Sequence, residues 1–525
     1  MRNSNRQASN HQAKSSQRSA SGWSNRILLA ATAGILFLTL YPFRVDVHRA
    51  LAQPTSPFLL GTAHKRAEAR DVFLNILLFV PFGFGLAEKL REKGKSRIAT
   101  FLWVLSAGAV FSYGIEFSQL FIPPRDSGWT DVSTNSTGSV VGFLLFESIG
   151  SPVLGFLSKC ESALASWLTL RRAVLILAIY FALVFWFSAM MQKQARLSEW
   201  DPGASLWLGN NGSARSGWAG KVLLVQLWDR AIPNILARKL TSGQMAEVPV
   251  NGLLGNYDLS GSPPFRDRQG LFPTLSLASR TPIQGDRGTF FLDRMSWLAS
   301  DGPITRFVRD VQHTNQFAFR LIYAPSNDSQ PNGAIISISR ARSSTDLVLR
   351  QENSELVFWF RTPLSIKRSQ LAWQVPNVFE GNQIRDILFS YDGSSLTVAI
   401  DGKQFPEKYE LTPGAALARL IRRIKPSELE GYALIYDSLV FLPAGFVLGL
   451  AVRRPQLSRV GASLLLAVAF LVPPALLELI LSRASGRAIS IDNILPALGL
   501  TVAGFLWINA EGLHNRPQGP DTSVQ

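Results

Sequence analysis

Cysteine, histidine and charge are all scarce in this chain. One cysteine, Cys160, among 525 residues excludes an internal disulfide framework. The five histidines show no paired spacing near acidic residues, so we expect neither a metal site nor a cofactor. Charged residues make up 17% and hydrophobic residues 47%. That balance indicates a multi-domain protein that lies partly in lipid and partly in water.

Acidic residues are outnumbered by basic ones, 37 to 53, which gives a formal charge of +16. The excess does not indicate a nucleic-acid partner, because the Lys and Arg residues are scattered and many flank apolar segments. Only the residues before Trp23 form a basic tail, and its Ser, Asn and Gln content predicts disorder. We assign residues 1–26 and 511–525 to disordered cytoplasmic tails.

Long apolar runs predict about eight membrane-spanning helices. A helix needs roughly 17–25 residues to cross the hydrocarbon core of a bilayer. The candidate spans are 27–43, 72–88, 98–121, 132–149, 172–191, 433–452, 458–481 and 491–509. No Ala-x-Ala-like cleavage site follows the first of them, which therefore reads as an uncleaved anchor.

Basic loops predict the orientation of these spans. Lys and Arg concentrate in the loops 88–97, 150–171 and 453–459. The positive-inside rule assigns such short loops to the cytoplasm. With the amino terminus inside, we expect a multi-pass protein of the inner membrane, with Cys160 inside and residues 192–432 extracytoplasmic.

Two parts of the chain resemble one another at an ungapped offset of 362 residues. The segment Phe79-Val80-Pro81-Phe82-Gly83 recurs as Phe441-Leu442-Pro443-Ala444-Gly445. The same offset relates four further pairs of residues: Asn75 and Asp437, Glu116 and Glu478, Arg125 and Arg487, Gly142 and Gly504. We predict two parallel membrane repeats, because both begin on the outer side. Proline should kink the first helix of each, and glycines should allow close helix packing: Gly83, Gly138, Gly142, Gly445, Gly499 and Gly504.

Polar side chains gather at the outer third of the predicted helices in both repeats. The candidate ligand-binding residues of the first repeat are Asp71, Asn75, Glu116, Gln119, Arg125, Asp131 and Asn135. Those of the second are Asp437, Glu478, Arg487 and Asp492. Ionisable groups at membrane depth usually face a cavity or one another, so we expect each set to converge, the second more sparsely. The catalytic candidates are Glu116, Arg125 and Asp131.

Structural roles compete with functional ones for these residues. An Asp at the start of a helix caps free N–H groups, which is the alternative for Asp71, Asp131 and Asp492. A Glu116–Arg125 pair is equally consistent with a structural ion pair. The recurrence of a Glu and an Arg at one spacing in both repeats favours a purpose beyond capping.

The first repeat resembles the VanZ-like family of bacterial membrane proteins. The motifs that carry the resemblance are Asp71-x-x-x-Asn75, Pro81-x-Gly83, Glu116-x-x-Gln119, Arg125 and Asp131-x-x-x-Asn135. It covers residues 27–149 well and 433–509 more loosely. The resemblance implies a cell-envelope location and a link to low-level glycopeptide resistance, without an established reaction.

The segment between the repeats changes character. Short alternating runs separated by Gly, Pro, Asp, Asn and Ser predict an all-β sandwich between about 197 and 413. The strings Phe389–Gly393 and Val398–Gly402 resemble a laminin-G-like, concanavalin-A-like jelly roll. The strands that close such a domain resemble 206–231, which precede the body, so we predict a circular permutation, with an appended hairpin as the alternative. Tryptophans here suit either a core or sugar stacking, and no glycosidase-like carboxylate pair is present.

These observations give a domain order and three functional hypotheses. We expect a VanZ-like module with flanking spans at 27–191, an extracytoplasmic jelly roll with its linker at 192–432, and a second module at 433–510. The favoured hypothesis is an envelope protein whose jelly roll binds a glycan or protein, while its modules recognise an anionic or lipid-linked component. The alternatives are a membrane enzyme with Glu116 as base and Arg125 as anion clamp, and a transporter.

Overall fold

The computed structural model describes residues 22–41, 69–122, 128–212, 217–245, 248–278, 291–326, 332–340, 344–365, 372–379, 383–406, 408–421, 429–453 and 459–514. Arg125 and most of both predicted tails lie outside these ranges. The chain forms two compact units. The first comprises Met1–Leu177, Leu442–Leu466 and Thr501–Gln525, and the second comprises Ala178–Phe441 and Ala467–Leu500.

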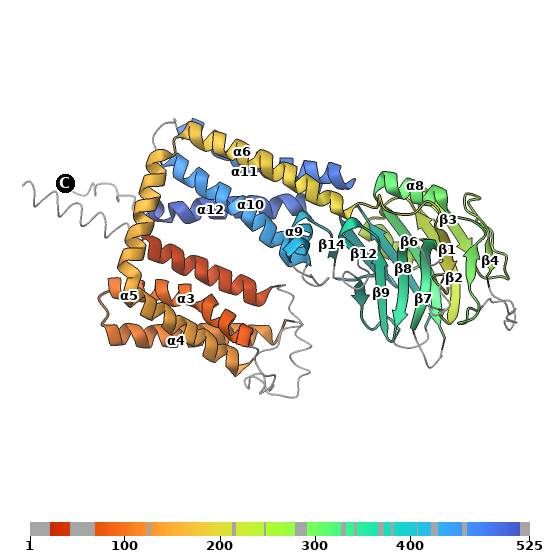
Figure 1. The fold of residues 1–525 in the computed structure, drawn as a ribbon, viewed down its shortest axis with the longest axis horizontal. Coiled ribbons are helices and arrows are strands. Elements are labelled where there is room, and N and C mark those ends of the chain that lie inside the picture. Colours follow the sequence, from red (N-terminus) through yellow and green to blue (C-terminus); the bar gives the residue numbers. More distant parts are fainter. Residues whose placement is uncertain are drawn as a thin grey trace, which may run out of the picture. The chain divides into compact units, whose positions relative to one another are not determined.

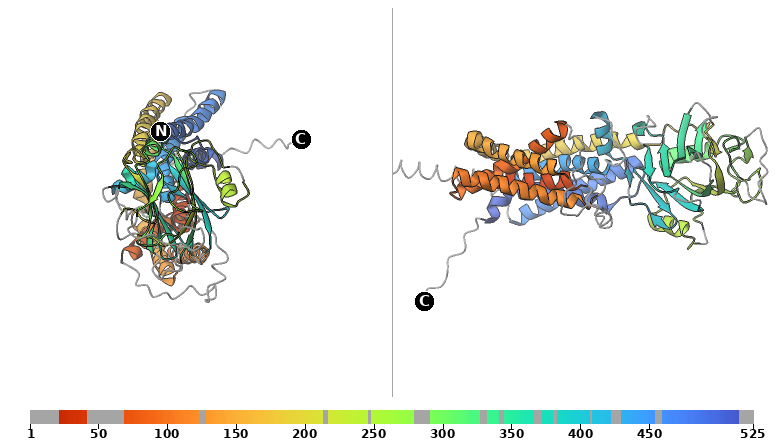
Figure 2. Two further views of the ribbon diagram at one scale, coloured as in Figure 1. Left: turned by 90° about the vertical axis from the view of Figure 1, so that its right-hand side faces the viewer. Right: turned by 90° about the horizontal axis from the view of Figure 1, so that it is seen from below.

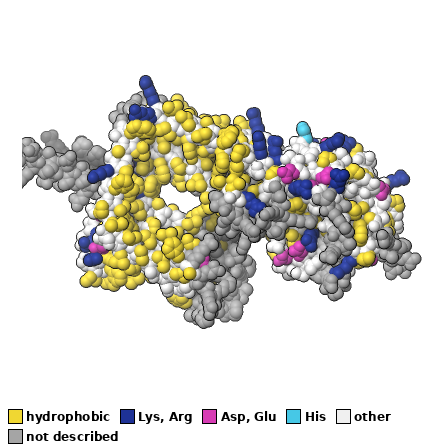
Figure 3. Space-filling model, viewed as in Figure 1, with side chains coloured by type: hydrophobic (Ala, Val, Ile, Leu, Met, Phe, Trp, Pro, Cys, Tyr) yellow, Lys and Arg dark blue, Asp and Glu magenta, His cyan; other side chains and the backbone are white. Residues whose placement is uncertain are grey.

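Eight of the described helices are long and apolar enough to cross a membrane, and each overlaps one predicted span. Their bounds are Gly22–Leu40, α3 (Ala69–Glu92), α4 (Arg97–Gln119), α5 (Trp129–Trp167), α6 (Leu170–Gln192), α10 (Leu429–Val452), α11 (Arg459–Ser485) and α12 (Ile491–His514). Hydrophobic side chains cover their outward surfaces (Figure 3), and Phe73, Trp103 and Val110 are each more than half exposed. Such a surface suits contact with lipid.

Helices α3, α4 and the first part of α5 lie side by side in the first unit (Figures 1 and 2). The Ser96 hydroxyl caps α4 by accepting the N–H of Ala99 at 3.2 Å. Glycine permits the closest approach. A Cβ on Gly83 would collide with the carbonyl oxygen of Ser139, and one on Gly142 with that of Val80. Backbones therefore meet where small residues recur, as in other membrane helix pairs.

Helix α5 extends well beyond its predicted end. We predicted a loop over 150–171, but the helix continues to Trp167 and α6 begins at Leu170. Pro152 lies inside α5, and the helix bends along its length (Figure 1). Proline removes one backbone hydrogen bond and clashes with the preceding turn, which gives the bend a physical cause.

One carboxylate near the end of α5 joins distant parts of the first unit. Glu161 pairs with Arg26 at 2.7 Å and with Arg453 at 2.5 Å. Both guanidinium groups also donate to the carbonyl oxygen of Ile508. Because Arg26 is only 2% exposed, its charge depends on these partners.

The insert folds as a β-sandwich of two antiparallel sheets in the second unit (Figure 1). The strands are β1 (Ser205–Leu208), β2 (Gly220–Trp228), β3 (Leu253–Asp258), β4 (Leu275–Leu277), β5 (Leu298–Ser300), β6 (Phe317–Pro325), β7 (Asn332–Arg340), β8 (Ser344–Glu352), β9 (Glu355–Phe360), β10 (Trp373–Val375), β11 (Arg385–Tyr391), β12 (Ser395–Ile400), β13 (Lys403–Gln404) and β14 (Tyr409–Glu410). One sheet has the order β10-β9-β8-β7-β1-β5-β4. The other has β13-β12-β11-β6-β2-β3, with β14 also paired to β12. The predicted sandwich is thus confirmed.

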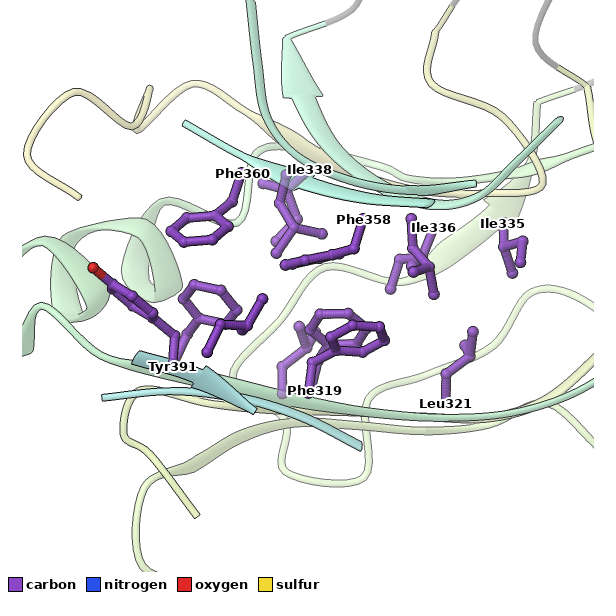
Figure 4. Close-up of a cluster of buried hydrophobic side chains, with 14 of the residues drawn as sticks. Phe319, Leu321, Ile335, Ile336, Ile338, Phe358, Phe360 and Tyr391 are labelled. Atoms are coloured by element: carbon purple, nitrogen blue, oxygen red, sulfur yellow. The ribbon is translucent and has the colours of Figure 1, made fainter. Parts of the chain in front are cut away.

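Aromatic side chains from both sheets interlock in the sandwich core (Figure 4). Phe319 on β6 pairs in register with Phe389 on β11, and their rings stack at 4.9 Å. Phe358 on β9 reaches across from the other sheet to Phe389 at 4.5 Å. Four tryptophans considered for sugar stacking are buried: Trp218, Trp228, Trp359 and Trp373. Their burial favours the core role for these four.

The early strands belong to the body of the sandwich. β2, which lies in the segment 206–231, pairs with β6 along its length. β1 lies in the opposite sheet, between β5 and β7. Since β1 and β2 belong to different sheets and both have two neighbours, the alternative of an appended hairpin is wrong.

Candidate functional site: two polar clusters and a cavity

The first polar cluster lies where α3, α4 and α5 pack together. The Asn75 side-chain amide on α3 donates to the Asp131 carboxylate on α5 at 2.8 Å. One helical turn further along α5, the Asn135 side chain donates to the Ser112 hydroxyl on α4 at 2.9 Å. The buried Glu116 carboxylate accepts the backbone N–H of Gly128 at 2.9 Å, just before α5 begins. Hydrogen bonds between side chains thus join the three helices.

Two predicted members take other positions, and a third lies outside the described residues. Gln119 donates to the carbonyl oxygen of Thr39, on the amino-terminal helix, at 2.9 Å. Asp71 is exposed in the first turn of α3. Arg125 lies outside the described residues, so its predicted pairing with Glu116 stays a prediction.

The second polar cluster closes the turn between α11 and α12. The Arg487 guanidinium makes a bidentate ion pair with Glu478, with Nη2 to Oε2 at 2.6 Å. The same carboxylate accepts the backbone N–H of Ser490 at 2.7 Å and the side-chain amide of Asn493 at 3.1 Å. Glu478 and Arg487 are 2% and 8% exposed. Four hydrogen bonds satisfy this carboxylate, so it suits a structural role better than that of a general base.

Asn493 is a member of this cluster that we did not predict. We matched Asp131 with Asp492, which is exposed in the first turn of α12. The ungapped offset of 362 instead matches Asp131 with Asn493. The offset also relates Asn75 to Asp437, so the Asn and Asp exchange places between the repeats. This exchange was the signal in the sequence that identifies the position.

Close contacts recur at the same offset in the second repeat. Glu116 accepts the N–H of Gly128, and Glu478 accepts that of Ser490. A Cβ on Gly445 would collide with the carbonyl oxygen of Thr501, and one on Gly504 with that of Leu442. These are the counterparts of the contacts made by Gly83 and Gly142. Gly499, also predicted to allow close packing, has no described atom within 4 Å of an added Cβ.

The sandwich binds the turn between α11 and α12 within the second unit. Asn315, in the left-handed conformation at φ 57°, donates to the carbonyl oxygen of Ser485 and accepts the N–H of Leu197. Gln316 donates to the carbonyl oxygen of Gly486. The end of α8 (Thr305–Thr314) therefore lies next to the loop that carries Arg487.

A cavity of about 530 Å³ lies between this end of the sandwich and helices α10, α11 and α12. Its lining includes three predicted site residues of the second repeat besides Glu478: Asp437, Arg487 and Asp492. Glu410 on β14 also faces it, and burial raises the pKa of that carboxyl group. Within the described ranges, no group of three or more His, Cys, Asp or Glu side chains has the geometry to hold a metal ion.

The comparisons with known proteins concern the amino-terminal part. Residues 5–150, less than a third of the chain, match the VanZ/LLP1 family model. Neither a curated protein nor a solved structure matches the chain significantly. The match includes α3, α4 and the first polar cluster. This part of the chain is therefore similar to VanZ-like modules, and the described chain carries eight candidate membrane-spanning helices.

Proposed function

We propose that this chain is an envelope-binding protein of the bacterial inner membrane, in which a β-sandwich is inserted between two VanZ-like modules. The recurrence of helix contacts and of the Glu-to-backbone bond at one offset supports the second module. The positions of the basic loops support an extracytoplasmic sandwich. The place of β2 between β3 and β6 supports a permuted jelly roll of the laminin-G or concanavalin-A type.

The observation that carries a binding role is the joint cavity. Residues of the sandwich and of the second membrane repeat line the same space. A site lined by the sandwich and by membrane helices suits an envelope component presented at the outer membrane surface, such as a lipid-linked glycan. Arg487 contributes little to capture of an anion, because its guanidinium is already paired with Glu478.

A membrane enzyme is the second candidate, and one observation favours it for the first module only. Among the described residues, the Glu116 carboxylate accepts a single hydrogen bond, from Gly128. The Glu478 carboxylate accepts four. A general base needs an available oxygen, so Glu116 is the better candidate of the two.

Extraction of the purified protein tests the binding role. The full-length chain, solubilised in detergent, should retain an envelope lipid or glycan that mass spectrometry detects. The same extraction from an unrelated protein with eight membrane helices provides the control. Equal recovery from both proteins would overturn the binding proposal. Turnover of a lipid-linked substrate that is lost in Glu116→Gln would support the enzyme instead.

The link to glycopeptide resistance is tested separately. Expression of the full chain in a susceptible host should raise the inhibitory concentration of teicoplanin. An unchanged value would remove this part of the proposal and leave the binding role intact.

A further inference from the structure

The cavity in the second unit has two walls of different chemistry. Its helical wall includes an apolar part formed by Phe441, Pro474, Leu477, Leu481 and Ala497, beside the helical carboxylates Asp437, Glu478 and Asp492. The sandwich supplies hydroxyl, amide and carboxylate groups, among them Gln316, Ser390, Thr397 and Glu410. A ligand that satisfies both walls is amphiphilic, because apolar area gains from burial while polar lining atoms need hydrogen-bond partners.

The charges of the lining describe the polar end of that ligand. The lining holds five carboxylates and two cations, a formal excess of three negative charges. The carboxylates are Asp392, Glu410, Asp437, Glu478 and Asp492, and the cations are Lys408 and Arg487. Glu478 and Arg487 neutralise each other in their ion pair. Lys408 is the other cation of the lining. An anionic headgroup would meet like charges in a partly desolvated site.

Existing hydrogen bonds narrow the choice of headgroup further. The Asp392 carboxylate already accepts the N–H groups of Ser394 and Ser395, so it shapes its own turn. Glu410 and Asp437, which come from the sandwich and from α10, both line the cavity. Two such carboxylates accept hydrogen bonds from hydroxyl or ammonium groups and repel phosphate.

We propose that the cavity binds a membrane amphiphile whose headgroup is rich in hydrogen-bond donors and carries no net negative charge. This inference rests on the proposed binding function and identifies its ligand class. The acyl chain lies along the helical wall, and the headgroup donates to Glu410 and Asp437. Sugar hydroxyls and an ammonium group share this chemistry, and matched probes separate them.

Three amphiphiles with the same dodecyl chain test the proposal on the full-length protein in phosphatidylcholine nanodiscs. Dodecyl maltoside presents hydroxyls, dodecylammonium presents a cation, and dodecyl phosphate presents an anion. Below their micellar concentrations, one or both of the first two should raise the thermal unfolding midpoint by several degrees. Dodecyl phosphate should raise it less. An equal or larger increase with dodecyl phosphate would overturn the proposal.

Two variants assign the effect to the cavity. Leu481→Trp fills the apolar end, and Glu410→Gln removes one acceptor charge while preserving shape. Each should weaken the apparent affinity at least tenfold, whereas Glu355→Gln on β9, outside the cavity, should not. If Leu481→Trp fails to fold, the test rests on Glu410→Gln. An unchanged affinity of that variant for the amphiphile would refute the site. If the protein retains an envelope component but is stabilised most by dodecyl phosphate, this inference is refuted and the proposed function is not. Selective stabilisation without any retained component would instead count against the proposed function.

Discussion

Glu478 accepts the backbone N–H of Ser490, twelve residues further along the chain, at 2.7 Å. The carboxylate thereby fixes the start of α12 while it neutralises Arg487. Glu116 holds Gly128 before α5 at the same separation of twelve residues. At both positions a buried acid thus holds the backbone just before the next helix begins.

Removal of this acid in the second repeat should destabilise the protein. Glu478→Gln leaves the Arg487 charge buried with a weaker partner, which costs roughly 3–5 kcal/mol when a buried pair is broken. Thermal unfolding of the full chain in detergent measures the loss. The double variant Glu478→Gln with Arg487→Gln should lose less than the sum of the two single variants. Asp310→Asn, which breaks an exposed pair with Arg306, provides the control and should have little effect.

Gly142 and Gly504 should be equally intolerant of a side chain. Each Cβ would meet a backbone carbonyl oxygen of the facing helix, at Val80 and Leu442 respectively. We expect each alanine variant to cost roughly 1–3 kcal/mol through overpacking. Gly114→Ala and Gly499→Ala are matched controls, since no described atom lies within 4 Å of either added Cβ. Comparable losses in all four variants would argue against the close helix approach.

Cys160 offers a direct test of orientation, because it is the chain's only cysteine and is exposed on α5. We expect a membrane-impermeant maleimide to label it in inside-out vesicles and to leave it unlabelled in right-side-out vesicles. The combined variant Cys160→Ser with Ser354→Cys, on the sandwich, should show the opposite pattern. Labelling of Cys160 from the outside would reverse the orientation of every span.

Asp346 should make the sandwich more stable in mild acid. Its side chain is fully buried, accepts the N–H of Asp201 at 2.8 Å and lies 3.6 Å from Arg361. Burial raises the pKa of Asp346 from 3.8 to about 6 despite these partners. The folded state therefore binds the proton more tightly, and the free energy of unfolding falls as pH rises from about 4 to 6. The fall is on the order of 2–3 kcal/mol.

The variant Asp346→Asn should remove that dependence, because the amide does not ionise and still accepts the Asp201 N–H. Unfolding followed by tryptophan fluorescence between pH 4 and 8 provides the measurement. If the free energy of unfolding changes equally with pH in both proteins between pH 4 and 6, other groups cause the pH dependence.

The sequence predicted the elements well, because hydrophobic period and run length are local properties. Runs such as 98–121 and 433–452 correspond to α4 and α10, and alternation predicted β6, β9 and β11. It also supplied the offset of 362, which linked Gly83 to Gly445 before any contact was known. The prediction for α5 was wrong at its carboxyl end, since polar residues after 149 do not by themselves end a helix.

Tertiary structure alone decided which neighbouring residue serves the second cluster and what surrounds it. Asp492 and Asn493 are adjacent in sequence, but a helix turns by about 100° per residue, so only one of them meets Glu478. The joint cavity depends on Asn315 and Gln316 reaching the backbone of Ser485 and Gly486, about 170 residues later. A periodic pattern records which face of an element is apolar. Which elements then meet depends on the packing of the whole chain.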